Sequence, residues 1–197
     1  MKFARGWVVV MFVAAVSVLG NASTTAARPI TSPRITAAAA ADVVIEQAQE
    51  MSDANLTQDY AALTDFMYPR LVKALGGRTA TIAKMQREMA EVADDNFDVL
   101  AIQVVSATVP VEAGAELHSV VTCYQYMRGP GMLFRAKTYL IAASSDAGSS
   151  WTFINVPKHN PEAIRAIFPA WNAALKIPTP PDAERVSTDL VIERTAK

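Results

Sequence analysis

Few side chains in this sequence could do chemistry, and His118 raises the most specific hypothesis. It lies near the start of a predicted strand, on a face that mixes aromatic, aliphatic and cationic residues. If that face lines a cavity, the imidazole could act as a general base, because its pKa lies close to neutrality. The alternative, which the sequence favours, is a strand histidine that is exposed or hydrogen-bonded.

The remaining residue inventory disfavours metal binding and nucleophilic catalysis. The chain has two histidines, His118 and His159, and one cysteine, Cys123, at no spacing that suits a zinc site. No Gly-x-Ser-x-Gly segment occurs, and Cys123 has no recognisable base beside it, so we expect a buried, inert thiol. We therefore predict no metal site and no cofactor.

Two cations, Arg135 and Lys137, alternate with apolar residues along a predicted strand. Together with Tyr126 they make the sheet face a candidate for an interaction surface. They could receive an anionic ligand, although charges on a solvated sheet face are the commoner explanation.

The segment "SSDAGSSWTF" (144–153) resembles the Asp-box of sialidases and related β-propellers. A propeller requires blades that repeat every ~40–50 residues, and no repeat is visible. The motif itself requires only a tight turn in which Asp146 accepts backbone N–H groups, Gly148 adopts a positive φ and Trp151 packs beneath. We therefore predict a hairpin turn between neighbouring strands, with Trp151 on the apolar side.

Hydrophobic periodicity predicts four helices before any strand. The first lies within 40–52, and its apolar stripe includes Val44 and Met51. A short helix follows within 58–67, and a third begins at Pro69 and ends at the glycine pair 76–77. The fourth spans roughly 81–94, with a core-facing stripe of Ile82, Met85, Met89 and Val92.

After residue 96 the pattern changes to period two and predicts strands within 97–105, 116–127, 132–144 and 150–156. A four-residue "RGPG" loop would place Met127 opposite Met132, Tyr124 opposite Arg135 and Val120 opposite Tyr139. One sheet face is then small and apolar and accepts the helices. The same alternation pairs Ala142 with Phe153 and puts Trp151 and Phe153 on that face. A short helix starting at Pro161 and an extended tail complete an α+β domain, in which N-terminal helices pack on a curved antiparallel β-meander.

The N-terminus has the features of a cleaved export signal. Lys2 and Arg5 precede the apolar run 7–20, which is shorter than the ~20 residues of a membrane-spanning helix. Small residues allow cleavage after Ala22, with Ala27 as a second candidate. Removing these two cations from 18 leaves 16 against 19 acidic residues, a net charge of −3. We expect a periplasmic or extracellular protein with no stable membrane anchor after cleavage and no affinity for nucleic acid.

The order of elements resembles the nuclear transport factor 2-like superfamily, a cone-shaped α+β fold that includes polyketide cyclases and ketosteroid isomerases. The segment "DYAALTDFMYPRLVKALGGRTATIAKM" (59–85) is similar to a pattern in exported bacterial members of unassigned activity, as are "GAELHSVVTCYQYM" and "FPAWNAALKIPTPP". The resemblance covers roughly 40–181 and implies one domain there. The sequence as a whole then divides into a signal peptide (1–22), a flexible lead-in (23–39), this domain (40–181) and a polar tail (182–197).

Enzymes of this superfamily place acid–base residues inside the cone. The residue types available here are Tyr60, Asp65, Tyr68, His118 and Tyr124. None matches a known catalytic position, so all five are candidates for lining a ligand pocket. We expect a non-enzymatic domain that binds a small apolar ligand or a protein partner, including a second copy of itself. The alternative is an isomerase, dehydratase or cyclase that uses these side chains.

Overall fold

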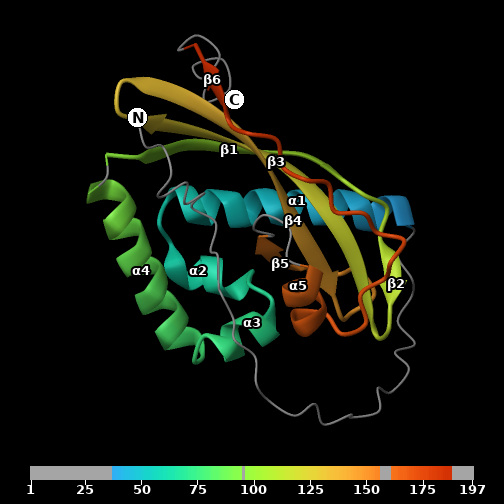
Figure 1. Ribbon diagram of the computed structural model, residues 1–197. Coiled ribbons are helices and arrows are strands. Elements are labelled where there is room, and N and C mark those ends of the chain that lie inside the picture. The colour runs from blue at the N-terminus through green and yellow to red at the C-terminus, as the bar shows by residue number, and fades with distance from the viewer. Residues whose placement is uncertain (1–36, 95, 156–160, 188–197) are drawn as a thin grey trace.

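The computed structural model describes residues 37–94, 96–155 and 161–187, which form five helices and six strands (Figure 1). The helices are α1 (Ala37–Leu56), α2 (Tyr60–Asp65), α3 (Pro69–Ala74), α4 (Arg78–Asp94) and α5 (Pro161–Ile167). The strands are β1 (Asp98–Ala107), β2 (Val111–Ala113), β3 (Glu116–Gly129), β4 (Met132–Ser144), β5 (Thr152–Asn155) and β6 (Glu184–Val186). The predicted α+β class is confirmed.

The predicted signal sequence and most of the lead-in lie outside the described residues, and α1 begins at Ala37, three residues before the predicted domain boundary. Within the described ranges, no helix is long and apolar enough to cross a membrane.

Local signals explain how the leading helices are connected. The side chain of Asp59 caps α2 by accepting the Ala62 N–H at 3.0 Å. Pro69 is the first residue of α3, as predicted. An N–H at this position has no acceptor within the helix, so proline costs the helix no hydrogen bond there.

The fourth helix begins earlier than the sequence predicts. Gly76 and Gly77 adopt φ values of 93° and 92°, which reverse the chain after α3. The Thr81 N–H donates to the carbonyl of Gly77 at 3.0 Å, so helical bonding starts at the glycine pair. As a result α4 starts at Arg78 rather than near Thr81.

The sheet has the strand order β1-β3-β4-β5, with β2 paired to β3 and β6 to β4, all antiparallel. The long β3–β4 hairpin forms its centre, and α1 packs along β1 and β3 (Figure 1). Two irregularities interrupt β1, between Val99 and Ala101 and between Val104 and Ser106.

The β3–β4 register differs from the prediction by two residues. The loop contains two residues, Pro130 and Gly131, so Gly129 pairs with Met132 and Met127 pairs with Phe134. Pro130 supplies the fixed φ of a turn's first central residue, and Gly131 supplies the positive φ of 73° that the second requires.

The predicted pair partners are therefore wrong, although the predicted faces are right. Tyr124 pairs with Lys137 rather than Arg135, and Val120 pairs with Ile141 rather than Tyr139. A shift of two residues keeps every side chain on its own face, because side chains alternate with period two.

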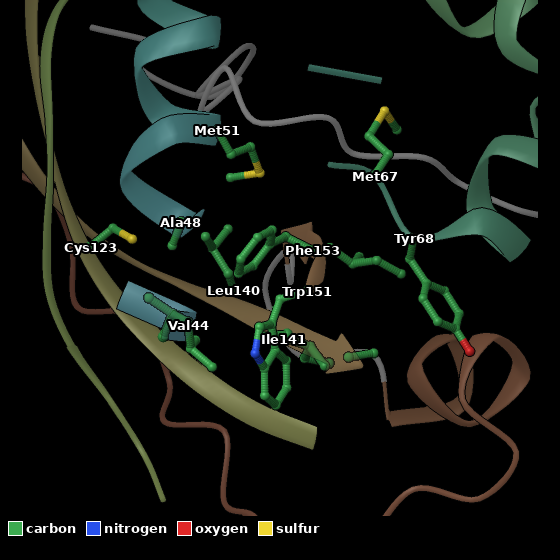
Figure 2. Close-up of a cluster of buried hydrophobic side chains, with 14 of the residues drawn as sticks. Val44, Ala48, Met51, Met67, Tyr68, Cys123, Leu140, Ile141, Trp151 and Phe153 are labelled. Carbon is green, nitrogen blue, oxygen red and sulfur yellow. The ribbon is translucent and has the colours of Figure 1, made fainter. Parts of the chain in front are cut away.

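The core lies between the leading helices and the predicted apolar face of the sheet (Figure 2). Val44 and Met51 of α1 and Met85 of α4 are buried, as their stripes predict. The remaining stripe residues of α4, Ile82, Met89 and Val92, are half-buried.

The Asp-box segment forms the turn between β4 and β5, and both its role and its geometry confirm the prediction. Asp146 accepts the Ser150 N–H at 2.9 Å and its hydroxyl at 2.6 Å, while Ser144 Oγ accepts the Gly148 N–H at 2.9 Å. Gly148 has a φ of 95°. Trp151 is 2% exposed and donates its indole N–H to the Gly148 carbonyl at 3.0 Å, so the turn encloses the ring.

Two glutamines of α1 bind main-chain groups outside the helix, one in the Asp-box turn and one in β1. Gln47 accepts the Trp151 N–H at 2.7 Å and donates to the Ser149 carbonyl at 3.1 Å. Gln49 accepts the Val104 N–H at 3.2 Å and donates to the Ile102 carbonyl at 3.3 Å. The helix is thereby joined both to the Asp-box turn and to the edge strand β1.

The second sheet face is partly covered by the C-terminal part of the chain. Val120, Tyr139 and Leu175 form a buried cluster, against which Trp171 and Ile177 pack. The sequence predicted a wetted or interacting face here and did not predict β6. The structure instead uses residues of the same chain to cover part of it.

Candidate functional site

The structure brings two of the five predicted pocket residues together, through a residue that sequence analysis missed. The Tyr68 hydroxyl donates to the Glu116 carboxylate, at 3.0 and 3.1 Å from its two oxygens. One of those oxygens lies 3.0 Å from Nε2 of His118. We call these three residues the Glu116 cluster.

Aromatic rings enclose the cluster. The His118 side chain is fully buried, with its ring edge-on to Phe168 at 5.0 Å and stacked on Trp171 at 5.6 Å between centroids. The Tyr68 ring lies 4.5 Å from Phe168. The cluster therefore joins the start of α3 and the segment after α5 to β3.

The protonation of the cluster follows from its contacts. Burial tends to raise the pKa of Glu116, but hydrogen bonds with His118 and Tyr68 and the charge of Arg70 outweigh it and hold the pKa below its ordinary value. Burial and the neighbouring Glu116 charge raise the pKa of Tyr68. At neutral pH an ionised Glu116 thus accepts from a neutral Tyr68, and His118 presents a protonated Nε2 to it, since a carboxylate can only accept.

His118 is therefore a buried, hydrogen-bonded strand histidine, the alternative that the sequence favours. Its other ring nitrogen, Nδ1, has no hydrogen-bond partner among the described residues. With no exposed surface, the side chain has no access to a substrate in this structure.

The other predicted site residues lie apart from the cluster. Asp65 forms an exposed ion pair with Arg78, and Tyr60 is half-buried, with a pKa raised by desolvation. Tyr124 lies on the second sheet face beneath Arg135, whose guanidinium is 4.8 Å from the ring centroid.

The three sheet-face candidates have partners within the chain. Tyr126 is 1% exposed, and Arg135 forms an ion pair with Glu184 of β6. The Lys137 ammonium lies 5.9 Å from the ring centroid of Tyr124 and 5.8 Å from that of Tyr139. These contacts account for the cationic groups on this face.

A cavity of about 30 Å³ lies between α1, α2, α3, β4 and β5. Its lining residues are Met51, Leu63, Met67, Leu71, Leu140, Phe153, Ile154, Asn55 and Asn155. We call it the Met51–Met67 pocket, and Figure 2 shows four of its lining side chains, those of Met51, Met67, Leu140 and Phe153. None of the five predicted candidates lines it, and none of the side chains that line it among the described residues is ionisable. Of the helix residues among these, the sequence singled out Met51, but only as a member of an apolar helix stripe.

Two polar side chains on the core face of the sheet have unpaired atoms. Gln125 is 0% and Thr138 5% exposed, and both amide atoms of Gln125 and the hydroxyl of Thr138 have no hydrogen-bond partner among the described residues. A buried polar group left without a partner costs about 1–3 kcal/mol. Period-two alternation puts Gln125 on the same face as Cys123 and Thr138 on the same face as Leu140, the apolar face, but it gives no sign that the two polar side chains are unpaired.

Metal and thiol chemistry find no support in the described part of the chain. No group of three or more histidine, cysteine, aspartate or glutamate residues could hold a metal ion within it. Burial raises the pKa of the Cys123 thiol to about 12, so the thiol is protonated at neutral pH.

No family model, curated protein or solved structure matches this chain.

Proposed function

We propose that this protein is an exported, non-enzymatic domain with the cone architecture of the nuclear transport factor 2-like superfamily, and that it binds a small apolar molecule in the Met51–Met67 pocket. The observation that carries the proposal is the lining of that pocket, which is apolar except for two asparagines. Concave apolar surfaces with a few polar groups are typical of small-molecule sites.

The position of the ionisable residues favours binding over catalysis. General acid–base catalysis needs a titratable group within hydrogen-bonding reach of the substrate. Tyr68 and His118, the candidates that meet, do so at Glu116 and not at the pocket.

The two methionines make the small pocket adaptable. Met51 of α1 and Met67, which follows α2, line the pocket and belong to different elements. Unbranched methionine side chains change rotamer at low cost, so a ligand larger than the free cavity can be admitted by their movement. This is why we expect binding despite a free volume of about 30 Å³.

Methionine methyl NMR tests the proposal with n-pentane as the apolar probe. With ¹³C-methyl methionine in the protein, pentane should shift the Met51 and Met67 signals saturably and give intermolecular NOEs to them. Met132, at the β3–β4 turn, is an internal control and should not respond.

A pocket-filling variant provides the matched comparison. Leu71→Phe should abolish the pentane-induced shifts, whereas Leu75→Phe, the same change at a residue of the α3 C-terminus that does not line the pocket, should preserve them. The NOEs in the unmodified protein keep the test valid if Leu71→Phe does not fold. Absence of any saturable response at Met51 and Met67 would refute the proposed function.

A further inference from the structure

We infer that Gln125 and Thr138 form the polar end of the ligand site, so that the ligand is a small uncharged molecule with an aliphatic body and one hydroxyl, carbonyl or amide group. The inference rests on the proposed function, because it assigns the chemistry of the same ligand. Its starting point is the three unpaired buried atoms on these two side chains.

The strand register places the polar pair beside the pocket. Thr138 and Leu140 are two residues apart on β4 and share a face, so they are neighbours about 7 Å apart along the strand. Leu140 lines the Met51–Met67 pocket. Thr138 therefore occupies the next position on the same wall, toward the β3–β4 turn.

Gln125 lies next to Thr138 across the hairpin. Gln125 pairs with Ala136 and Thr138 pairs with Cys123, which makes the two polar residues diagonal neighbours on one face. Diagonal neighbours are within reach of long side chains. One ligand group can therefore contact both the amide and the hydroxyl.

The surroundings determine the charge of the ligand group. Across the sheet, Gln125 lies between Ile102 of β1 and Ala136 of β4, and Cys123 and Met127 flank it along β3 on the same face. No charged side chain is among these neighbours to compensate an ionic group, whose burial alone is strongly unfavourable. A neutral group that both donates and accepts suits an amide and a hydroxyl, which each do both.

The pair n-pentane and 1-pentanol tests this inference. A purely apolar pocket prefers pentane, because the hydroxyl of pentanol would lose its hydrogen bonds with water and gain none in the pocket. If Gln125 and Thr138 receive that hydroxyl, the unmodified protein should bind pentanol at least as tightly as pentane, measured by methionine methyl titration. Thr138→Val and Gln125→Met keep the side-chain size and should each shift the preference toward pentane by about tenfold.

A matched control is available on the opposite face of the hairpin. Thr122→Val removes a hydroxyl from β3 without touching the core face and should leave the preference unchanged. Because the two core-face variants remove unpaired polar atoms, each should also raise the melting temperature of the ligand-free protein. A lower melting temperature in both would show that internal bonds satisfy these atoms and would overturn the inference.

The outcomes separate this inference from the proposed function. If neither probe reaches Met51 and Met67, both fail. If pentane binds and Leu71→Phe blocks it, but neither Thr138→Val nor Gln125→Met changes the pentanol preference, the pocket stands and its polar end is refuted.

Discussion

Replacing Glu116 by alanine removes a carboxylate that accepts hydrogen bonds from two enclosed side chains, Tyr68 and His118, and the cost follows from the structure. A hydrogen bond to a charged group contributes about 1.5–3 kcal/mol. The Glu116 side chain is 28% exposed, so solvent screening favours the lower end of that range. Two bonds, one with Tyr68 and one with His118, give an expected loss of about 3 kcal/mol of unfolding free energy.

Tyr68→Phe measures the contribution of one of the two bonds, because it removes the hydroxyl that donates to Glu116 and keeps the ring against Phe168. We expect it to cost about half as much, ~1.5 kcal/mol. Asp65→Ala is the control, since it removes an exposed ion pair with Arg78 and should cost less than about 1 kcal/mol.

Urea denaturation at pH 7, followed by tryptophan fluorescence, measures these differences. A loss below 1 kcal/mol for Glu116→Ala, or equal losses for Glu116→Ala and Tyr68→Phe, would refute the argument that the carboxylate holds two donors.

The same cluster predicts a pH dependence with two limits. The pKa of Glu116 is lower in the folded protein, so its contribution is complete above the unfolded pKa of about 4.5 and is lost as pH falls through the folded value. The pKa of Tyr68 is raised, so its contribution is complete below the unfolded value of 10.0 and is lost as pH rises toward the folded value. Tyr68→Phe should remove its share of the alkaline loss, and an unchanged alkaline limb would contradict the assignment.

Three further predictions concern the turn and the sheet edge. Trp151→Ala should lower the free energy of unfolding by about 3–5 kcal/mol, as large aromatic truncations in cores do, and an unchanged denaturation midpoint would count against the packing described. Asp146→Ala removes the acceptor of two hydrogen bonds from Ser150 and should lower the free energy of unfolding by about 1–3 kcal/mol. Because those bonds hold the pKa of Asp146 down despite burial, the difference between the variant and the unmodified protein should shrink as pH falls below the ordinary carboxyl range. Gln49→Ala should cost about 1–2 kcal/mol and speed hydrogen exchange at the Val104 amide, and unaltered exchange there would mean that Gln49 does not protect this edge.

The faces of the sheet were predictable from the sequence, but its register was not. Period-two alternation assigns Cys123, Leu140 and Phe153 to the core regardless of loop length, provided that the parity is kept. Two-residue and four-residue loops at "RGPG" have the same parity, so hydrophobic pattern alone does not distinguish them. The positive φ of Gly131 decides between them, and that is a property of the folded turn.

The residues of the candidate site were harder to identify, for a different reason. Glu116 follows a glycine turn at the start of a strand, a position typical of solvated carboxylates, and nothing local indicates that Tyr68 will reach it across 48 residues. In the sequence, the pocket methionines have the spacing of ordinary core residues. A cavity forms where the packed side chains leave space between them, and hydrophobic periodicity carries no information about that space. The three-residue strand β6 is polar and has no pattern at all.

Gln125 and Thr138 are polar residues at positions where the period-two pattern predicts apolar ones. Their side-chain chemistry is therefore informative about function. Buried polar residues can be retained because they specify the register of paired elements rather than because they bind a ligand. Here the register already has two determinants, the Pro130–Gly131 turn and the β4–β5 pairing that is fixed by the Asp-box turn. A register role would also require the two side chains to recognise a partner in the correct pairing, and their polar atoms have none among the described residues. Because sequences that fold well violate local rules mainly at functional sites, the unpaired amide and hydroxyl are better explained by a ligand group than by folding.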